Sequence, residues 1–235
     1  MEYQPIAYIH NDFPTKFGLP RQSGLSEHLI SRIVMEKEYR NPDAFRGIEE
    51  FEYLWLIWCF ESMGKRASSK RASSKRAWSP TVRPPKLGGN KRMGVFATRS
   101  PNRPNPVGLT RVKLLSLDLT AEGPVLTVSG ADLMSGTAIL DIKPYLPFAD
   151  SVPDALTGAY GPGTQEPLAV VIPPDIAALF TAPQLAALRE ALSCDPRPGY
   201  QSDPDRVYGF AYGGYDIRFR VADGTATVCS AEKRG

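Results

Sequence analysis

The stretch that most constrains the fold of this chain is RSPNRPNPVG, from Arg99 to Gly108. It contains three prolines, each of which fixes its own φ angle and lacks an amide hydrogen to donate. These residues therefore exclude a helix and interrupt any strand, although apolar, strand-like residues flank the stretch on both sides. The sequence predicts a stiff loop inside a β-rich region.

Several segments on either side of this loop are typical of short strands. They are PIAYIH near the N-terminus, FEYLWLIWCF at 51–60, and the segments 93–98, 107–120, 124–134 and 138–146. Both faces of the segment 51–60 are apolar, which predicts a strand buried on both sides. Glycine, proline or polar turns separate the later segments without intervening helices, so we expect an antiparallel sheet or a closed barrel.

The character of the sequence changes after about Ser151. A helix is expected after Thr181, a possible N-cap, because leucines then recur on one face, and a hairpin is expected around Asp223-Gly224. We therefore predict a mainly β protein. It would have an N-terminal antiparallel sheet or closed β-barrel over 1–152 and a small C-terminal α+β domain over 153–235.

Positive charge is concentrated between Ser62 and Lys113. This segment has fourteen Lys or Arg residues and no Asp or Glu, which is half of the 28 basic residues of a chain with net charge +3. Such a region is typical of a protein that binds a polyanion, because neutralised phosphates release counterions. A solvated, charged loop is the other interpretation.

Within this basic region, the repeat KRASSKRASSKRA at 65–77 has no apolar surface to bury. We expect a flexible basic insertion there. It is either an arm for RNA phosphates or a repeat without function.

The sequence gives little support to several other function classes. Three cysteines lie far apart and there are only two histidines, so we expect no disulfide framework, no metal site and no Ser–His catalytic machine. No GxGxxG fingerprint follows a strand. No apolar run reaches membrane-spanning length and the first residues lack a signal pattern, so the expected location is cytoplasmic, without membrane association.

The proline-rich loop itself allows two interpretations. A rigid backbone lowers the cost of presenting Arg99, Arg103 and Asn105 to a phosphate or carboxylate. Alternatively, the loop closes a barrel, and its arginine side chains bridge backbone carbonyls. Composition alone favours neither.

Longer motifs in the chain resemble the TsaA-like, or TrmO, family of tRNA methyltransferases. They are GVFATRSPNRPNPVGLTRVKLL, WSPTVRPPKLGGN before it and DIKPYLPFADSVPDA after it, and FGLPRQSGL, DAFRGIEEFEYLWLI and DPRPGY also fit. The resemblance implies an N-terminal β-barrel that binds S-adenosylmethionine, a smaller C-terminal domain and a homodimer. It also implies methylation of the exocyclic amino nitrogen of N6-threonylcarbamoyladenosine, next to the anticodon of threonine tRNAs, with no metal.

The same resemblance assigns residues to the cofactor and to the tRNA anticodon loop. The expected cofactor-binding residues are Pro20, Arg21, Gln22, Glu61, Ser62, Arg99, Leu109, Leu133, Met134, Ser135 and Gly136. For the RNA, the resemblance points to Arg197 and Tyr200, and we expect the cations Lys91, Arg92 and Arg103 to contact phosphates. Tyr200 can stack on an unpaired base or pack in a domain interface instead.

Asp132 and Asp141 are the candidate catalytic residues. An amide-like nitrogen is a poor nucleophile, so a proton acceptor beside it is expected, although either carboxylate could instead have a structural capping role. Two positions depart from the family's pattern: Ser135 stands where an Asp is usual, and Glu61 stands where relatives often carry His. Without the usual Asp, only backbone carbonyls or a hydroxyl would contact the sulfonium or amino group of the cofactor.

Three functions follow from these observations. The leading one is an S-adenosylmethionine-dependent tRNA methyltransferase. The others are a non-catalytic RNA-binding or regulatory relative of the same fold, and a methyltransferase that acts on a different acceptor.

Overall fold

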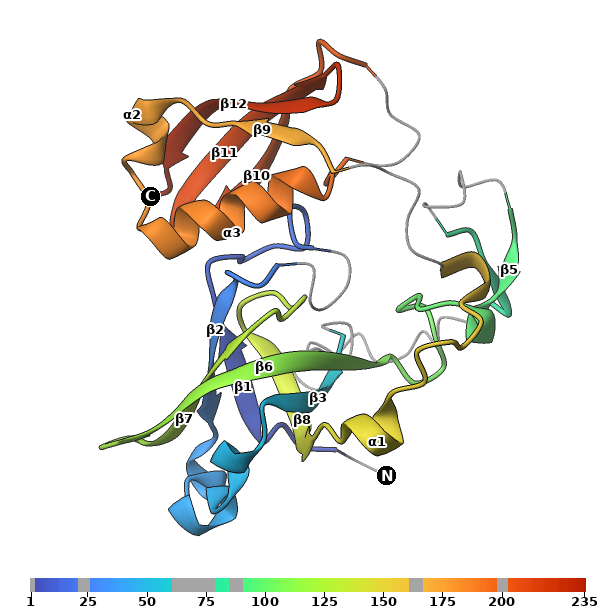
Figure 1. Cartoon of the computed structure of the whole chain (residues 1–235), viewed down its shortest axis with the longest axis vertical. Helices are drawn as coiled ribbons and strands as arrows, with labels where there is room; N and C mark the ends of the chain where they lie inside the picture. The colour runs from blue at the N-terminus through green and yellow to red at the C-terminus, as the bar shows by residue number, and fades with distance from the viewer. Residues whose placement is uncertain (1–2, 21–25, 61–78, 85–90, 161–166, 198–202) are drawn as a thin grey trace, which may run out of the picture.

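Six strands close into an antiparallel β-barrel in the computed structural model, which describes residues 3–20, 26–60, 79–84, 91–160, 167–197 and 203–235 (Figure 1). Around the barrel the order is β1-β2-β7-β6-β3-β8, and every neighbouring pair is antiparallel. The barrel predicted from the sequence is therefore confirmed. The strands are β1 (Ala7–His10), β2 (Ile30–Met35), β3 (Tyr53–Cys59), β6 (Val107–Thr120), β7 (Gly123–Ser129) and β8 (Thr137–Pro144).

Strand β3 buries only one of its two apolar faces. Leu54, Leu56 and Trp58 point into the barrel and are at most 9% exposed. The alternate residues, Trp55 and Ile57 among them, are only half-buried. The prediction that both faces are buried is therefore wrong. The physical reason is that the outer face of β3 borders a pocket, so its aromatic residues serve as pocket walls.

Three short 3-10 helices connect β2 to β3: η1 (Lys37–Tyr39), η2 (Pro42–Phe45) and η3 (Ile48–Glu50). The side chain of Asn41 caps η2 by accepting the N–H of Asp43 at 3.0 Å. Phe45 is 6% exposed and belongs to the barrel core. The connection therefore contributes apolar surface to the barrel.

The proline-rich loop precedes β6 and begins with a single tight turn. β4 (Thr81–Val82) and β5 (Met93–Gly94) form a short antiparallel pair, and η6 (Val95–Ala97) follows. The N–H and the Oγ1–H of Thr98 both donate to the carbonyl of Val95, at 3.2 and 2.8 Å. These bonds curl the backbone, so the prediction of a strand over 93–98 is wrong beyond Gly94.

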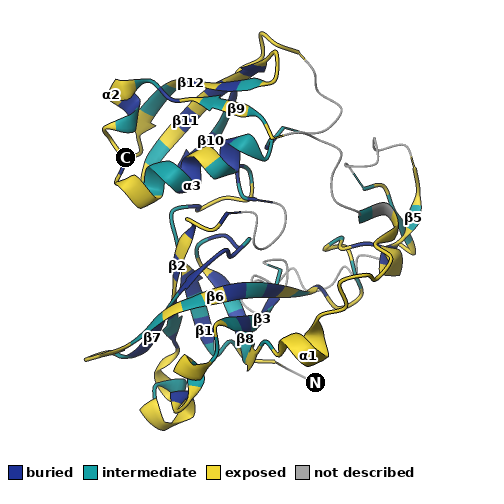
Figure 2. Cartoon of the chain, viewed as in Figure 1, coloured by how far each residue is buried: buried dark blue, intermediate teal, exposed yellow. Residues whose placement is uncertain are grey.

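The segment after β8 extends along the proline-rich loop in Figure 1. It contains α1 (Pro147–Asp150) and η7 (Gly158–Tyr160). The hydroxyl of Tyr160 accepts the N–H of Arg99 at 3.3 Å, which ties the two segments together. Figure 2 shows that α1 is exposed, in contrast to the buried interior of the barrel.

A four-stranded sheet and a helix form the C-terminal domain. The sheet order is β10-β11-β12-β9, and only the pair β12–β9 is parallel. A capping box between Thr181 and Gln184 begins α3, as the sequence predicts, and the hairpin that turns at Asp223-Gly224 is confirmed. The elements are β9 (Ala169–Val171), α2 (Pro174–Ala177), α3 (Ala182–Ser193), β10 (Tyr208–Tyr212), β11 (Tyr215–Ala222) and β12 (Thr225–Lys233).

Apolar side chains from the N-terminal half complete the core of this C-terminal domain. Phe13 and Leu29 are at most 1% exposed and belong to the same cluster as the residues of α3 and the sheet. The ring of Phe13 lies 4.7 Å from that of Tyr212, centroid to centroid. The barrel and the C-terminal domain are therefore joined by shared hydrophobic burial, and the boundary near residue 152 stays a prediction. No helix in the described ranges is long and apolar enough to span a membrane.

Glu190 of α3 adds polar contacts between the two domains. Its carboxylate accepts from the Ser26 hydroxyl at 2.7 Å and from the His28 N–H at 3.1 Å, and it lies 2.5 Å from Nδ1 of His28. The hydrogen bond and the negative charge of Glu190 raise the pKa of His28 above its usual value of 6.5.

This pair predicts a pH-dependent contribution to stability. Because the pKa of His28 is raised in the folded state, the contribution is fully present below pH 6.5 and is lost as the pH rises through the raised pKa. The variant Glu190→Gln keeps a hydrogen-bond acceptor but removes the charge. Its melting temperature should fall below that of the wild type at pH 6 and approach it at pH 8.5, by an amount equivalent to less than about 1 kcal/mol because His28 is largely exposed.

The measurement is a pair of thermal melts of wild type and Glu190→Gln at the two pH values. His28→Gln is the matched variant, since it removes the other member of the pair. A difference in melting temperature that is the same at both pH values would contradict this assignment.

Candidate active site

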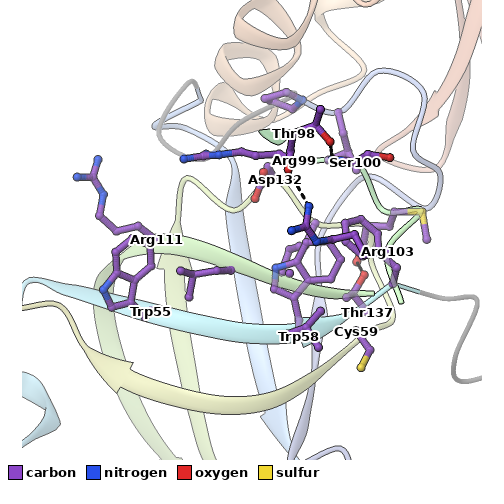
Figure 3. A pocket seen from close by; sticks show the side chains of 18 of the residues that line it. Trp55, Trp58, Cys59, Thr98, Arg99, Ser100, Arg103, Arg111, Asp132 and Thr137 are labelled. Carbon is purple, nitrogen blue, oxygen red and sulfur yellow. Dashed lines mark hydrogen bonds between the residues drawn. The ribbon is translucent and has the colours of Figure 1, made fainter. Parts of the chain in front are cut away.

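A pocket of about 830 Å³ lies against the outer face of β3 and β6 (Figure 3). The proline-rich loop, residues 98–103, forms one side of it. The connection from β7 to β8, residues 132–134, forms a second side, and Tyr145 with residues 150–153 forms a third. The volume is in the range of cavities that hold a drug-sized ligand or a nucleoside cofactor.

A chain of hydrogen bonds runs from the barrel interior to a carboxylate at the pocket wall. Nε1–H of Trp58 donates to Oγ1 of Thr110 at 2.9 Å, and the hydroxyl of Thr110 donates to Oδ1 of Asp132 at 2.7 Å. Thr110 is 1% exposed. Because its hydroxyl receives one bond and gives the other, it holds one oxygen of the carboxylate in a fixed place.

The environment of Asp132 makes its carboxylate more basic than usual. Burial raises the pKa of Asp132, while the Thr110 hydrogen bond and the charge of Arg99 lower it and offset part of the shift. Arg99 is exposed and also lines the pocket. In Figure 3 the labelled side chains of Asp132 and Arg99 lie next to each other on one side of the pocket.

A second carboxylate in the pocket lining, that of Asp150, has the opposite shift. One oxygen of Asp150 accepts both Nε1–H of Trp55 and the N–H of Leu146, each at 2.9 Å. These two hydrogen bonds lower the pKa of Asp150. Asp150 is therefore a structural anion, and Asp132 is the better proton acceptor of the two.

The two arginines of the proline-rich loop have different roles in the structure. Nη1 of Arg103 donates to the carbonyls of Val95 and Thr98, at 3.0 and 2.7 Å, and its guanidinium lies 5.5 Å from the ring centroid of Phe96. Arg103 thus bridges backbone carbonyls, as the barrel-closing interpretation of the loop predicts. Arg99, in contrast, extends its side chain along the pocket (Figure 3).

One end of the pocket is aromatic. The ring of Tyr145 lies 5.6 Å from that of Trp55, and the guanidinium of Arg111 lies 5.1 Å from the ring of Tyr53 and 5.5 Å from that of Tyr145. Trp55 and Arg111 are directly opposite each other on β3 and β6. This end offers flat apolar surface beside a positive charge.

Covalent and metal chemistry have little to use in this site. Burial raises the pKa of the Cys59 thiol, which lines the pocket, and so disfavours the thiolate that a nucleophilic cysteine needs. Within the residues that the structure describes, no group of three His, Cys, Asp or Glu side chains lies close enough to hold a metal ion.

The structure brings many of the sequence-predicted cofactor residues together. Two predicted residues face elsewhere: Ser135 accepts the N–H of Asn11 on its hydroxyl at 3.3 Å, and Gly136 turns the chain with a φ of 84°. The predicted cofactor residues that line the pocket are Pro20, Arg99, Leu109, Leu133 and Met134, and the candidate catalytic residue Asp132 lines it with them.

Asp141, the other candidate proton acceptor, lies apart from the pocket lining. Its carboxylate is 2.8 Å from Nζ of Lys143 and also accepts the N–H of Ile142 at 2.9 Å. The two candidates are therefore not adjacent, and only Asp132 borders the cavity.

The predicted RNA-binding residues are spread over the molecule. Lys91 and Arg92 are exposed just before β5, and Arg103 lines the pocket. Nε and Nη2 of Arg197 donate to the carboxylate of Asp195, each at 2.9 Å. Five predicted residues and the repeat lie outside the described residues: Arg21, Gln22, Glu61, Ser62, Tyr200 and 65–77.

Neither the aromatic end of the pocket nor the Thr110 bridge was among the features predicted from the sequence. The alternation of β6 carried a usable signal, because Val107, Leu109 and Arg111 share the outer face and all three line the pocket. The sequence contains no comparable signal for the role of Thr110, because that role depends on the position of Trp58 on the neighbouring strand.

Both halves of the chain match domains of one known protein family. Residues 8–151 match the tRNA-methyltransferase O N-terminal domain, and residues 165–234 match the TrmO C-terminal domain. The tRNA (adenine(37)-N6)-methyltransferase of Escherichia coli K12 is 36% identical over 99% of this chain and 98% of its own length. The Eikenella corrodens protein of the same name is 41% identical over 76% of this chain and 95% of its own length. A crystal structure of TrmO from P. aeruginosa superposes with a TM-score of 0.76 at 27% identity, covering 100% of this chain and 97% of that one.

The Thr110 bridge predicts an asymmetric response to two substitutions. Thr110→Val removes the hydroxyl and leaves the indole N–H of Trp58 and the carboxylate of Asp132 without this partner, which should lower the free energy of unfolding by about 2–3 kcal/mol. Thr110→Ser keeps the hydroxyl, so its free energy of unfolding should fall by less. Urea denaturation measures both, and a Val variant as stable as the Ser variant would show that the bridge contributes nothing.

Proposed function

The chain belongs to the TrmO family of tRNA methyltransferases, and on this basis we propose the reaction that it catalyses. It transfers a methyl group from S-adenosylmethionine to the exocyclic amino nitrogen of N6-threonylcarbamoyladenosine at position 37 of threonine tRNA, beside the anticodon. The observation that carries the proposal is the nucleoside-sized pocket in which Asp132, held by the Thr110 hydroxyl, lies beside Arg99, where burial raises the pKa of Asp132. This arrangement gives one group in the site the character of a proton acceptor.

The residues in the pocket fit S-adenosylmethionine. The guanidinium of Arg99 suits its carboxylate, and the carboxylate of Asp132 supplies the negative charge that its cationic groups require. Leu109, Leu133 and Met134 offer apolar surface to its adenine ring. When bound, the cofactor supplies an activated methyl group.

The residues of the chain contribute position and proton transfer. Thr110 holds one oxygen of Asp132 in place, and the raised pKa makes this carboxylate better able to accept the proton that leaves the acceptor nitrogen. The rigid proline-rich loop holds Arg99 beside Asp132 at the pocket wall. Such positioning supplies much of the rate in an in-line transfer between two bound molecules.

We also propose that the basic surface near the pocket binds the tRNA backbone. Lys91 and Arg92 are exposed cations that precede the proline-rich loop. Because phosphate neutralisation releases counterions, such residues add affinity without base specificity. Arg197 pairs with Asp195, and this contact holds a stiff turn. That Arg197 and Tyr200 contact the RNA stays a prediction. Its tRNA substrate makes the cytoplasm the proposed compartment.

A homodimer is proposed as the functional assembly. The segment after β8 exposes large apolar side chains: Phe148 is 88% exposed, Val152 is 71% exposed and Leu156 is 101% exposed. A cluster of this kind on one segment is typical of an interaction surface. Because Val152 also lines the pocket, an interface there would place a second chain next to the site.

The reaction is tested by methyl transfer from labelled S-adenosylmethionine to threonine tRNA with and without threonylcarbamoyladenosine. Label is expected in the modified tRNA only. Asp132→Asn should lower kcat at saturating cofactor by about 10²–10⁴-fold, because it removes the proton acceptor, and should also weaken calorimetric cofactor affinity, because it removes the negative charge beside the cationic groups of the cofactor.

Asp141→Asn is the matched control, since it removes a carboxylate that lies outside the pocket, and its activity should equal that of the wild type. Loss of activity in Asp141→Asn with retention in Asp132→Asn would exchange the two roles. If the wild type binds cofactor but labels neither tRNA, a different acceptor is indicated. If it binds none, the protein is a non-catalytic relative.

The dimer is tested by light scattering after size-exclusion chromatography. The wild type should elute with twice the mass of one chain, and Phe148→Glu should elute as a monomer, since it places a charge in the interface. Leu119→Glu is the matched control, because Leu119 is 65% exposed at the end of the β6–β7 hairpin. A monomeric wild type, or a Phe148→Glu dimer, would contradict this interface.

A further inference from the structure

Arg111 differs from the other cations on the outer barrel wall because it is held by rings. Its guanidinium lies 5.1 Å from the ring centroid of Tyr53 and 5.5 Å from that of Tyr145. Among the residues that the structure describes, none accepts a hydrogen bond from it or lies within ion-pair distance. In contrast, Lys113 on the same face pairs with Glu52 at 3.3 Å.

A carboxylate in the same pocket lining is engaged elsewhere. One oxygen of Asp150, Oδ2, accepts both the indole N–H of Trp55 and the N–H of Leu146, and no ion pair between Asp150 and Arg111 forms within the described residues. Trp55 lies directly opposite Arg111 in the register of β3 and β6. The arrangement therefore keeps the five N–H donors of Arg111 available beside an aromatic wall, with no acidic partner to neutralise the charge.

A guanidinium held in this way is preorganised to bind a planar anion. Its fork of donors matches the two oxygens of a carboxylate or of a phosphate, and the flanking rings hold it by cation–π attraction before any ligand arrives. Because the side chain is already ordered, little conformational entropy is lost when the anion binds.

The position of Arg111 indicates which molecule supplies this anion. In Figure 3, Arg111 and Trp55 lie at one end of the pocket, Trp58, Cys59 and Arg103 lie at the other, and Asp132 and Arg99 lie between them. The cofactor carboxylate already has Arg99 as its partner in the proposed function. The aromatic end is then the place for the acceptor, whose threonylcarbamoyl group carries its own free carboxylate.

We propose that Arg111 binds the carboxylate of the threonylcarbamoyl group and thereby selects modified over unmodified adenosine. The inference rests on the proposed function and adds its specificity determinant. An unmodified adenosine has no carboxylate, so it leaves the guanidinium without a partner when the pocket fills and water is excluded. A site built to bind a polar group in this way rejects an analogue that lacks it.

The test compares the affinity of two matched threonine tRNAs, one with threonylcarbamoyladenosine at position 37 and one with plain adenosine there. Fluorescence anisotropy gives both dissociation constants without requiring turnover. The wild type should prefer the modified tRNA. Arg111→Met should weaken binding of the modified tRNA by about 10- to 100-fold, as expected for a charge-assisted hydrogen-bonded pair, and leave the unmodified tRNA unchanged.

Lys113→Met is the matched control. It removes a cation from the same face of β6, two residues away, where the charge is paired with Glu52 outside the pocket lining. Its preference for the modified tRNA should equal that of the wild type. Arg111→Lys keeps the charge but loses the forked pair of donors, so its affinity for the modified tRNA should lie between those of the wild type and Arg111→Met. It also covers the case in which the Met variant folds poorly.

The outcomes separate this inference from others. Equal weakening of both tRNAs by Arg111→Met would show a backbone phosphate contact and overturn the proposal, and an unchanged preference would overturn it as well. In steady-state assays the loss should appear as a raised KM for modified tRNA, with cofactor affinity unchanged by calorimetry. Failure of the proposed function is distinct, because it would appear as a wild type that transfers no methyl group to modified tRNA.

Discussion

The packing of Trp58 against Gly108 is the constraint on which the candidate site depends. A Cβ at position 108 would lie 2.2 Å from the Trp58 ring, so β6 can pass the indole only with a glycine there. With the ring seated, its N–H reaches Thr110, and the Thr110 hydroxyl reaches Asp132. One close approach between β3 and β6 therefore fixes the place of a carboxylate on a third segment, the connection between β7 and β8. Because the chain is held at all three points by a closed barrel, this geometry requires no ligand to form it.

The barrel also explains why the site lies on its outer wall. A small six-stranded barrel fills its interior with side chains, and Leu54, Leu56 and Ile139 are fully buried there. A ligand of nucleoside size must bind outside, where the half-buried face of β3 and β6 supplies aromatic and apolar surface. The proline-rich loop and the segment after β8 form the sides of the pocket around that face, and the hydrogen bond between Arg99 and Tyr160 joins the two segments. The same loop divides its arginines between two tasks, since Arg103 holds the turn and Arg99 reaches into the pocket.

The periodicity of the sequence was sufficient to predict an antiparallel sheet or barrel, the C-terminal α+β unit, the start of α3 at Thr181 and the Asp223-Gly224 hairpin. The resemblance to the family decided for the barrel. Periodicity failed where local hydrogen bonds or tertiary neighbours decide the outcome. The strand expected over 93–98 ends at Gly94 because the Thr98 hydroxyl bonds to Val95, and apolar content alone misplaced the outer face of β3 in the interior. The resemblance to the family indicated Leu133 and Met134, which line the pocket, and also Ser135 and Gly136, which do not, while Asp132 was proposed on chemical grounds. The sequence could not separate Asp132 from Asp141, because the difference between them is the presence of Lys143 beside one and of Thr110 beside the other.

The opposite pKa shifts of Asp132 and Asp150 arise from what each carboxylate accepts. Asp150 is exposed and receives two N–H donors, which favour the ionised form, whereas Asp132 is desolvated and a single hydroxyl only partly compensates. Both groups line one cavity, but only Asp132 is buried there, while Asp150 keeps its donors from Trp55 and Leu146. In the proposed reaction this difference assigns the proton from the acceptor nitrogen to Asp132 and leaves Asp150 as a structural anion that holds Trp55 and the turn at Leu146.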